Sequence, residues 1–299
     1  MKKNIVCFGE VLWDVLPTEK VAGGAPMNVA IRLQSLGIPT KIISKIGNDI
    51  LGSELISIIK NKNVNTSQIQ IDEKIKTGEV LVKLDSNGIA TYEIIYPSAW
   101  DKIELTKENK NLVQNSDAFV FGSLACRDEI SKNTLMHLLG FAKYKIFDVN
   151  LRQPFYSISL IEELMHKSDF VKLNDDELLI IAKAFGSDKT EIEVNIKFIS
   201  QKTNTNSICV TKGKDGAILF IGNKFYSHNG FKVKVEDTVG AGDSFLAALI
   251  SKILTSKNYS ESLEFACAVG ALVAAQKGAN PILDLLDIKK IINNKFHNG

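Results

Sequence analysis

The residues best suited to chemistry lie in segment 237–245, which reads Asp-Thr-Val-Gly-Ala-Gly-Asp-Ser-Phe. Gly240 and Gly242 precede an apolar, helix-like run, and glycine lets a backbone approach a ligand closely. The first amides of a helix have no intrahelical partner and carry the positive end of its dipole, so this turn can hold a phosphate. Asp243 adds a carboxylate beside the anion site. An anion site next to a base is what phosphoryl transfer to a hydroxyl requires.

A purely structural interpretation of this segment is equally open. Asp and Ser are favoured helix N-caps and glycine is common in tight turns, so a capped helix without a ligand would look similar. Two nucleotide-binding motifs are excluded, because the chain has no G-x-x-x-x-G-K-[ST] sequence and 240–245 lacks the third glycine of the dinucleotide fingerprint. Glu261 and Glu264, about twenty positions further on, lie in a helical pattern, which disfavours a dehydrogenase.

A second glycine turn lies near the N-terminus, where Gly23 and Gly24 precede Pro26. Proline suits the first turn of a helix, and the glycines allow close approach just before it. Asn28 can donate and accept hydrogen bonds, and Asp14 can accept them from paired hydroxyls. This mixture suits a polyol, although a loop with a favoured helix start would explain the glycines alone.

These turns need a scaffold, and the chain alternates short β-branched runs with longer amphipathic segments. The expected strands are 4–12, 41–47, 118–124, 145–150, 170–173 and 207–211, and the first expected helices are 26–36 and about 52–62. Residues from 232 onward alternate with a period of two, so a strand is expected to lead into the Gly240 turn. This alternation predicts βαβ units and a mostly parallel sheet. No linker rich in Pro, Gly or Ser divides the chain, so one α/β domain is expected over 1–299.

One segment departs from this alternation. Residues 78–85 and 90–96 are alternating apolar runs, and the turn between them contains Asn87-Gly88, the strongest short-range signal for a β-hairpin. Such a ribbon does not join a parallel sheet easily. It is either an edge hairpin or a flap over a site at the carboxyl edge of the sheet, and the sequence leaves both open.

Composition narrows the class of protein further. The 299 residues include 36 Lys and Arg against 34 Asp and Glu, and 45% are hydrophobic. This near balance argues against nucleic-acid binding, and the apolar content argues against disorder. The longest uncharged apolar stretch, 265–276, is too short for a membrane span, and Glu10 and Asp14 interrupt the N-terminal apolar run, so no signal peptide is expected. The four Cys and four His are scattered, which suits a reducing cytoplasm, so a cytoplasmic protein without disulfides or a zinc site is expected.

Two segments together resemble the signatures of a known family. Residues 23–37 are similar to the N-terminal signature of the ribokinase-like sugar kinases, the PfkB family, and 237–245 resembles the C-terminal signature. The two stand in the family's order, and the resemblance covers essentially the whole chain. Shorter matches at 9–14, 121–124 and 148–152 are similar to the fructokinase branch in particular.

The resemblance implies a ribokinase-like fold, in which a mostly parallel central sheet has helices on both faces and carries a small β-sheet lid. The lid is expected at about 11–20 and 76–100, so the hairpin becomes part of it. A lid excludes water, which competes with the sugar as phosphoryl acceptor. Lid sheets of this family can also pair between subunits, so a homodimer is a further expectation.

The resemblance also implies roles for single residues. Asp243 would accept the proton of the attacking sugar hydroxyl, and Gly240, Ala241 and Gly242 would form the anion hole for the transferring phosphoryl group. The residues expected to bind the sugar are Asp14, Gly23, Gly24, Asn28, Arg152 and Trp100. The last two also have simpler interpretations, a surface ion pair for the arginine and a packing contact for the tryptophan.

ATP and Mg²⁺ are the implied cofactors, with K⁺ as a further candidate. The residues expected on the nucleotide side are Asn174, Thr211, Gly213, Gly216, Cys267 and Gly278. Glu177, in an N-x-x-E element, is expected near Mg²⁺, and Asp237 near a monovalent cation. An N-capped acidic helix start explains Asp175 and Asp176 nearly as well, and a plain β-turn explains 211–216. Residues 282–284 depart from the family's pattern, which weakens the transfer of the adenine pocket and of the cation loop.

The resulting hypothesis is an ATP-dependent sugar kinase that phosphorylates fructose. Ribose and 2-keto-3-deoxygluconate are the alternative substrates within the family. A catalytically silent sugar-binding relative is an alternative from another class, but such a protein needs a pocket and has no use for a base. A dehydrogenase is the third interpretation. The expected partners are a sugar and ATP, and neither nucleic acid nor a membrane is expected.

Overall fold

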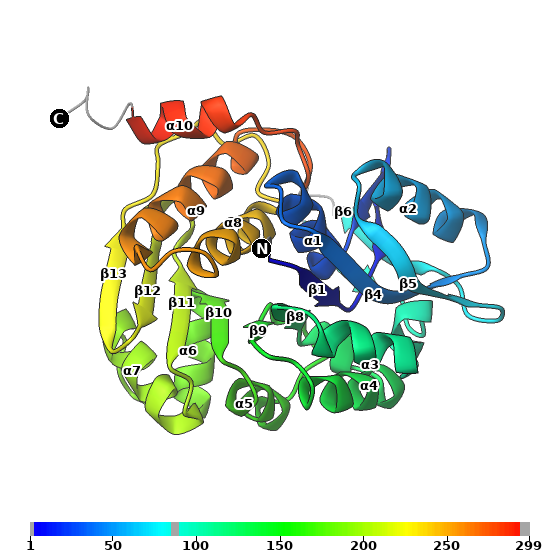
Figure 1. Cartoon of the computed structure of the whole chain (residues 1–299), viewed down its shortest axis with the longest axis horizontal. Coiled ribbons are helices and arrows are strands. Elements are labelled where there is room, and N and C mark those ends of the chain that lie inside the picture. Colours follow the sequence, from blue (N-terminus) through cyan, green and yellow to red (C-terminus); the bar gives the residue numbers. More distant parts are fainter. Residues whose placement is uncertain (1–2, 85–89, 294–299) are drawn as a thin grey trace. The chain divides into compact units, whose positions relative to one another are not determined.

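The computed structural model describes residues 3–84 and 90–293. The chain folds into two compact units, Met1–Lys143 and Tyr144–Gly299 (Figure 1). Each unit contains parallel strands covered by helices, so both follow the βαβ pattern that the sequence predicts. A single domain over 1–299 stays a prediction.

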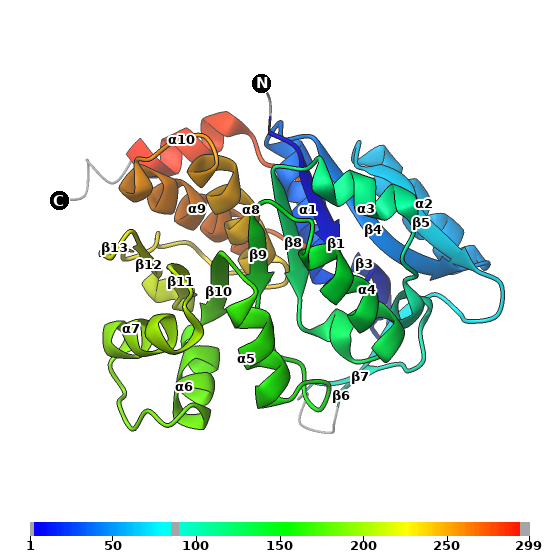
Figure 2. The same cartoon turned by 60° about the horizontal axis from the view of Figure 1, so that its bottom comes forward.

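The first unit is built on four parallel strands in the order β8-β1-β4-β5. These are β1 (Ile5–Phe8), β4 (Thr40–Gly47), β5 (Asn65–Asp72) and β8 (Ala118–Gly122). The helices are α1 (Ala25–Ser35), α2 (Ile50–Asn61), α3 (Lys107–Gln114) and α4 (Glu129–Leu139), with the short 3-10 helices η1 (Ala99–Lys102) and η2 (Leu124–Cys126). Because α1 and α2 cover one side and α3 and α4 the other, β1 and β8 are buried along their whole length (Figures 1 and 2).

The strand expected at 4–12 is divided in two. The backbone at Gly9 has a φ of 138°, which glycine adopts readily, and β1 ends just before it. The chain then enters β2 (Leu12–Val15), which belongs to a separate sheet in the order β3-β2-β6-β7. Its other strands are β3 (Lys20–Gly23), β6 (Gly78–Leu84) and β7 (Ala90–Ile94). The small sheet is therefore confirmed, while the predicted Asn87-Gly88 turn lies outside the described residues.

The second unit contains three parallel strands, followed by two antiparallel ones. These are β9 (Lys145–Asp148), β10 (Phe170–Asn174), β11 (Ser207–Thr211), β12 (Ala217–Ile221) and β13 (Lys224–His228). The helices are α5 (Ile158–His166), α6 (Asp175–Ala184), α7 (Ile192–Thr203), α8 (Ala241–Ile253), α9 (Tyr259–Ala274) and α10 (Leu285–Asn293), with the 3-10 helix η3 (Gly213–Asp215). Helices α8 and α9 lie on one side of the strands, and α6 and α7 on the other (Figures 1 and 2). The parallel strands end at one edge, where Asp148, Asn174 and Thr211 stand.

The strand expected between residue 232 and the Gly240 turn is not formed, and this prediction was wrong. The amides of Glu236 and Asp237 donate to the carbonyl of Ala274 at the end of α9, at 2.8 and 3.2 Å. These bonds occupy backbone groups that a strand ladder would need. Val235 is exposed, so the alternating pattern has no buried face there. The chain therefore reaches α8 as an irregular segment.

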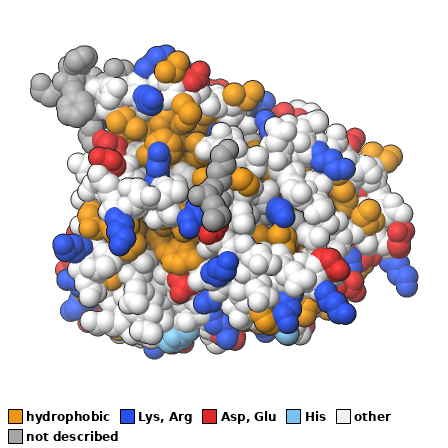
Figure 3. Space-filling model, viewed as in Figure 1, with side chains coloured by type: hydrophobic (Ala, Val, Ile, Leu, Met, Phe, Trp, Pro, Cys, Tyr) orange, Lys and Arg blue, Asp and Glu red, His pale blue; other side chains and the backbone are white. Residues whose placement is uncertain are grey.

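Charged side chains of both signs are intermixed on the face drawn in Figure 3, with hydrophobic ones between them. This distribution agrees with the near balance of 36 basic and 34 acidic residues. Over residues 3–84 and 90–293, no helix combines the length and apolar character that crossing a bilayer requires.

Candidate active site

The N-terminus of α8 has a geometry suited to an anion. Gly240 caps the helix in the left-handed conformation, with φ 72° and ψ −1°, and no described side chain caps it there. Asp243 lies in the first turn of the same helix. The Ala241 amide donates to the carbonyl of Thr238 at 3.2 Å, so its role in an anion hole stays a prediction.

A second loop holds the Gly240 turn in place. A Cβ on Gly240 would lie 2.6 Å from both the Cα and the carbonyl oxygen of Ala279, so the two backbones are in contact and only glycine fits. The carboxylate of Asp237 joins the same segments, because it accepts hydrogen bonds from the amides of Val239 at 2.9 Å and Gly278 at 3.0 Å. Asp237 therefore has a structural role, and its role near a monovalent cation stays a prediction.

Lys172, which the sequence analysis missed, lies beside this turn. Lys172 on β10 and Asp148 on β9 are paired in register, and Nζ lies 3.0 Å from Oδ1. A Cβ on Gly242 would lie 3.4 Å from the same Nζ, so the ammonium group lies against the start of α8. The sequence feature that could have indicated Lys172 is its place within the otherwise apolar strand 170–173. Lysine is almost never fully buried unless it is paired, so a lysine there predicts a partner.

Asn174 and Glu177 form a capping box at the start of α6. The Asn174 side chain accepts a hydrogen bond from the Glu177 amide at 2.8 Å. The Glu177 carboxylate accepts from the amides of Asn174 at 2.9 Å and Leu151 at 2.8 Å. Burial raises the pKa of Glu177, and nearby Lys172 opposes this rise. The N-capped helix start is therefore confirmed.

A magnesium ion fits the site beside Glu177, where the parallel strands of the second unit end, only with ligands from outside the protein. In the part of the chain that the structure describes, no three His, Cys, Asp or Glu side chains are grouped to hold a metal. At phosphoryl-transfer sites Mg²⁺ usually keeps several waters and binds through one or two carboxylates plus substrate phosphates. Glu177 can supply such an oxygen, because each of its oxygens makes one protein hydrogen bond and has a second lone pair.

The predicted nucleotide-side glycines lie in a tight turn after β11. Thr211 ends the strand, and Gly213 and Gly216 have φ values of 54° and 82°. A Cβ on Gly216 would overlap the carbonyl of His228, so the turn itself requires this glycine. The plain-turn interpretation therefore fits Gly216, and nucleotide contacts by Thr211 and Gly213 stay predictions.

Arg152 and Cys267 differ in their exposure. Arg152 is exposed beyond β9 and donates to the carbonyl of Leu151 at 3.0 Å, but it makes no ion pair with any described residue. The described residues therefore give no support to the simpler interpretation of Arg152 as a surface ion pair. Cys267 is buried within α9. The sugar role of Arg152 and the nucleotide role of Cys267 stay predictions.

In the first unit, four predicted sugar-binding residues lie together where β3 meets α1. A Cβ on Gly23 would overlap Oδ2 of Asp14, so this glycine leaves room for the carboxylate. Gly24 precedes α1 with a φ of 110° and lies against the carbonyl of Glu10. The amide of Asn28 donates to the carbonyl of Gly24 at 2.9 Å, and Asn28 is buried in the first turn of α1.

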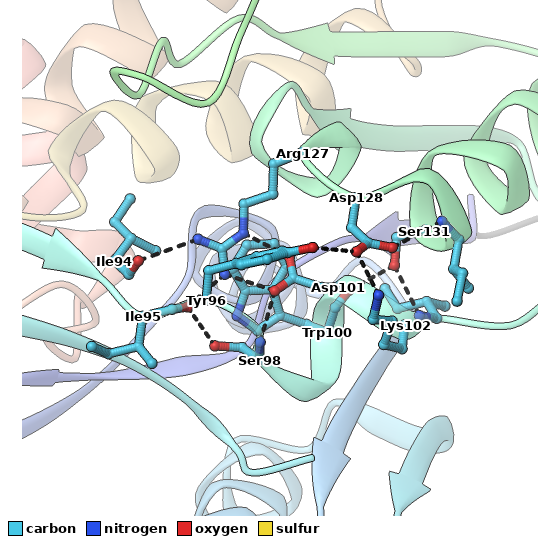
Figure 4. A network of polar contacts seen from close by, with 12 residues as sticks. Ile94, Ile95, Tyr96, Ser98, Trp100, Asp101, Lys102, Arg127, Asp128 and Ser131 are labelled. Carbon is cyan, nitrogen blue, oxygen red and sulfur yellow. Dashed lines mark hydrogen bonds and ion pairs between the residues drawn. The ribbon is translucent and has the colours of Figure 1, made fainter. Parts of the chain in front are cut away.

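Trp100 is placed differently from those four residues. It is fully buried in η1, and its ring centroid lies 4.0 Å from the guanidinium carbon of Arg127 (Figure 4). A Cβ on Gly78 would overlap Nε1 of Trp100, so the first residue of β6 packs on the indole. This burial favours the packing interpretation and gives no support to the predicted sugar contact.

Arg127 also forms a polar network beside the small sheet (Figure 4). Its guanidinium donates to both carboxylate oxygens of Asp101, at 2.6 and 2.8 Å, and to the carbonyl of Ile95 at 2.6 Å. The next residue, Asp128, accepts a hydrogen bond from the hydroxyl of Tyr96 at 2.9 Å. The network therefore attaches the chain that leaves β7 to the segment before α4.

Comparisons with known proteins show that the chain is similar to sugar kinases in sequence and in fold. The pfkB family carbohydrate kinase pattern matches residues 2–285. A fructokinase of Solanum tuberosum is 31% identical over 303 residues, covering 93% of this chain and 92% of the relative. An uncharacterized sugar kinase from Pyrococcus horikoshii is 28% identical, with a TM-score of 0.82 over 97% of this chain and 100% of that chain. A fructokinase from Xylella fastidiosa with bound ATP has 23% identity and a TM-score of 0.87 over 99% of this chain and 100% of that one.

The mostly parallel strands, their covering helices and the separate four-stranded sheet define a ribokinase-like sugar-kinase fold. The chain belongs to the pfkB family of carbohydrate kinases. The predicted fold class and family are therefore confirmed, and the chain is a kinase and not a dehydrogenase.

Proposed function

We propose that this carbohydrate kinase transfers the γ-phosphoryl group of ATP to a hydroxyl of fructose. The observation that supports the proposal is the start of α8, where Gly240 caps the helix in the left-handed conformation and Asp243 lies in the first turn. The Solanum tuberosum relative is named a fructokinase, which favours fructose as the acceptor. The Xylella fastidiosa structure is described with bound ATP, which favours ATP as the donor.

Asp243 is the base in the proposed mechanism. It accepts the proton of the sugar hydroxyl while the hydroxyl oxygen attacks the γ-phosphorus, and the bond between that phosphorus and ADP breaks. An aspartate with a pKa of about 3.9 is a weak base, which suffices when the transition state is loose and the proton leaves late. In this proposal the amides of Gly240, Ala241 and Gly242 donate to the transferring group, and the Ala241 amide would exchange its hydrogen bond to the Thr238 carbonyl for this one.

The nucleotide and its cations are assigned to the second unit. Glu177 is the proposed ligand of Mg²⁺, which would neutralise charge on the phosphates when bound. K⁺ is proposed near Asp237, which already joins two loops. The proposed nucleotide contacts are Asn174, Thr211, Gly213, Gly216, Cys267 and Gly278. An ATP donor also fits the expected cytoplasmic location.

The sugar is assigned to the turn between β3 and α1. Asp14 accepts hydrogen bonds from paired hydroxyls, Gly23 and Gly24 allow close approach, and Asn28 donates and accepts. The small sheet is proposed as a lid that excludes water. Strand β7 is an edge strand of that sheet, so its outer backbone groups can pair with a second copy in a homodimer.

An ADP-release assay with Mg²⁺-ATP tests this proposal over a panel of fructose, ribose and 2-keto-3-deoxygluconate. Fructose is expected to give the highest kcat/KM. Higher efficiency with ribose or 2-keto-3-deoxygluconate would overturn only the choice of sugar. No turnover with any sugar would favour the catalytically silent sugar-binding relative.

A further inference from the structure

Lys172 and Asp148 form a buried ion pair on neighbouring strands of the second unit. Lys172 is 7% exposed and Asp148 is 3% exposed, and their side chains meet at 3.0 Å. Burial alone would lower the pKa of Lys172, but the nearby carboxylates of Asp148, Glu177 and Asp243 raise it. The ammonium group therefore stays charged although it is buried.

Stability alone gives a poor account of this pair. Removing two charges from water costs about as much as their attraction returns, and well-packed apolar residues often replace such pairs without loss. The flanking residues of β10, Val171 and Leu173, are apolar and fully buried, so an apolar residue would suit the strand. Two charges at the carboxyl edge of these strands therefore indicate a role beyond packing.

The pair also has hydrogen-bonding capacity that the described residues leave unused. An ammonium group has three donor hydrogens. Among the described residues, Lys172 uses one of them, in the hydrogen bond to Oδ1 of Asp148. The other carboxylate oxygen, Oδ2 of Asp148, is buried without a hydrogen-bond partner among those residues. Buried polar groups are nearly always paired, so the two unused donors of Lys172 indicate a ligand with acceptor oxygens. Oδ2 of Asp148 can only accept a hydrogen bond, so it is not a contact for such a ligand.

The position of the ammonium group indicates which ligand this is. A Cβ on Gly242 would lie 3.4 Å from Nζ of Lys172, so the ammonium group and the first amides of α8 lie on one patch. Both carry positive charge, and such donors together bind an oxyanion. We propose that Lys172 donates to the phosphate oxyanion bound at the start of α8, and that Asp148 holds the ammonium group there. This inference rests on the proposed phosphoryl transfer.

Tripolyphosphate, titrated calorimetrically without sugar or metal, tests the binding step directly. Lys172→Met is expected to weaken its binding about ten- to a hundredfold, because one charge-assisted hydrogen bond is lost. Lys172→Arg keeps the charge and should retain most of the affinity. Lys45→Met is the matched control, because Lys45 is equally buried, at 8% against 9% side-chain exposure, and pairs with Asp72 at 3.0 Å.

Lys172→Met leaves Asp148 buried and unpaired, which can prevent folding. The double variant Lys172→Met/Asp148→Asn removes both charges, and it should fold and bind tripolyphosphate as weakly as Lys172→Met. Unchanged affinity in either folded variant, or a wild-type protein that does not bind tripolyphosphate, would overturn the proposal. A weakening as large in Lys45→Met would also overturn it.

Sugar turnover separates this inference from the proposed function. With a sugar that the wild-type protein phosphorylates, kcat should fall about a hundredfold or more in Lys172→Met and recover in Lys172→Arg. Losses of this size are typical when a donor to a developing negative charge is removed. A purely structural role would lower stability and leave kcat of the folded variant unchanged. If the wild-type protein phosphorylates no sugar, the proposed function fails, and the tripolyphosphate titration still decides the role of Lys172.

Discussion

Arg127 and Asp101 form a buried ion pair with two hydrogen bonds, of 2.6 and 2.8 Å, between the guanidinium and the carboxylate. The side chains are 1% and 0% exposed. The same guanidinium lies over the ring of Trp100 and donates to the carbonyl of Ile95 (Figure 4). A planar, forked donor group can make all these contacts together, and a lysine cannot. The pair therefore gives the end of the small sheet a fixed attachment.

Replacing Asp101 with Asn should destabilise the protein by about 3–5 kcal/mol, because it leaves the Arg127 charge buried without its partner. Urea unfolding measures this change in the free energy of unfolding. Glu129→Gln is the control, because Glu129 pairs with Lys132 but its side chain is 73% exposed. That control should change stability by less than about 0.5 kcal/mol. An equally small loss in Asp101→Asn would contradict the buried-pair account.

Asp72 should make the protein sensitive to acid. Burial opposes ionisation, but hydrogen bonds from the Ile75 and Lys74 amides and from Lys45 lower the pKa of Asp72 to about 2. A carboxyl with a depressed folded-state pKa stabilises the fold above its unfolded pKa, about 3.9, and loses that contribution as the pH falls towards about 2. Asp72→Asn should therefore cost about 2 kcal/mol at pH 7, as urea unfolding would show. A cost that stays constant as the pH falls from about 5 to 2 would refute this assignment.

Gly240→Ala should be more damaging than Gly222→Ala, although both glycines have a left-handed φ, of 72° and 59°. Each substitution costs about 1–2 kcal/mol for the backbone conformation. A Cβ on Gly240 also meets Ala279, whereas a Cβ on Gly222 has nothing within 4 Å. We expect a further loss of about 1–3 kcal/mol at Gly240, together with loss of phosphorylation. Thermal unfolding and ADP release measure both, and equal effects would mean that the contact with Ala279 does not constrain the turn.

Gly23→Ala should weaken sugar binding with little effect on the nucleotide. The added Cβ would overlap Oδ2 of Asp14 and displace the carboxylate proposed to bind hydroxyls. We expect KM for the sugar to rise about tenfold or more, as for a lost hydrogen bond to a charged group, while KM for ATP stays near its wild-type value. Gly37→Ala is the control for the sugar KM, because a Cβ there meets nothing within 4 Å, although its φ of 81° makes alanine costly to stability. A sugar KM no higher than in the control would argue against Asp14 as a sugar ligand.

Local signals in the sequence predicted much of the fold. The strand at 207–211 has the expected bounds, and β10 extends one residue beyond 170–173, because both are buried, largely apolar runs. The strand expected at 4–12 was wrong in length, since the break at Gly9 depends on pairing with two different sheets. The strand expected from 232 failed because its backbone bonds to Ala274, a contact that periodicity does not reveal.

In the candidate site too, contacts between residues far apart in the sequence could not be predicted. The glycine turns and their acidic neighbours could be predicted because their residues are contiguous in the sequence. The Lys172–Asp148 and Arg127–Asp101 pairs join residues 24 and 26 positions apart, and they form only when strand register or chain packing brings them together. A lone lysine in a strand predicts a partner but does not identify it.

The central claim is that Asp243 is the base for phosphoryl transfer, and transfer of the labelled γ-phosphoryl group from ATP to fructose tests it most directly. Wild-type protein should label the sugar, and Asp243→Asn should do so about 10²–10⁴-fold more slowly, because the hydroxyl proton then has no acceptor. Asp176→Asn is the control, because Asp176 is an exposed acid in the first turn of α6, and it should keep the wild-type rate. Labelling by folded Asp243→Asn at the wild-type rate would contradict the account.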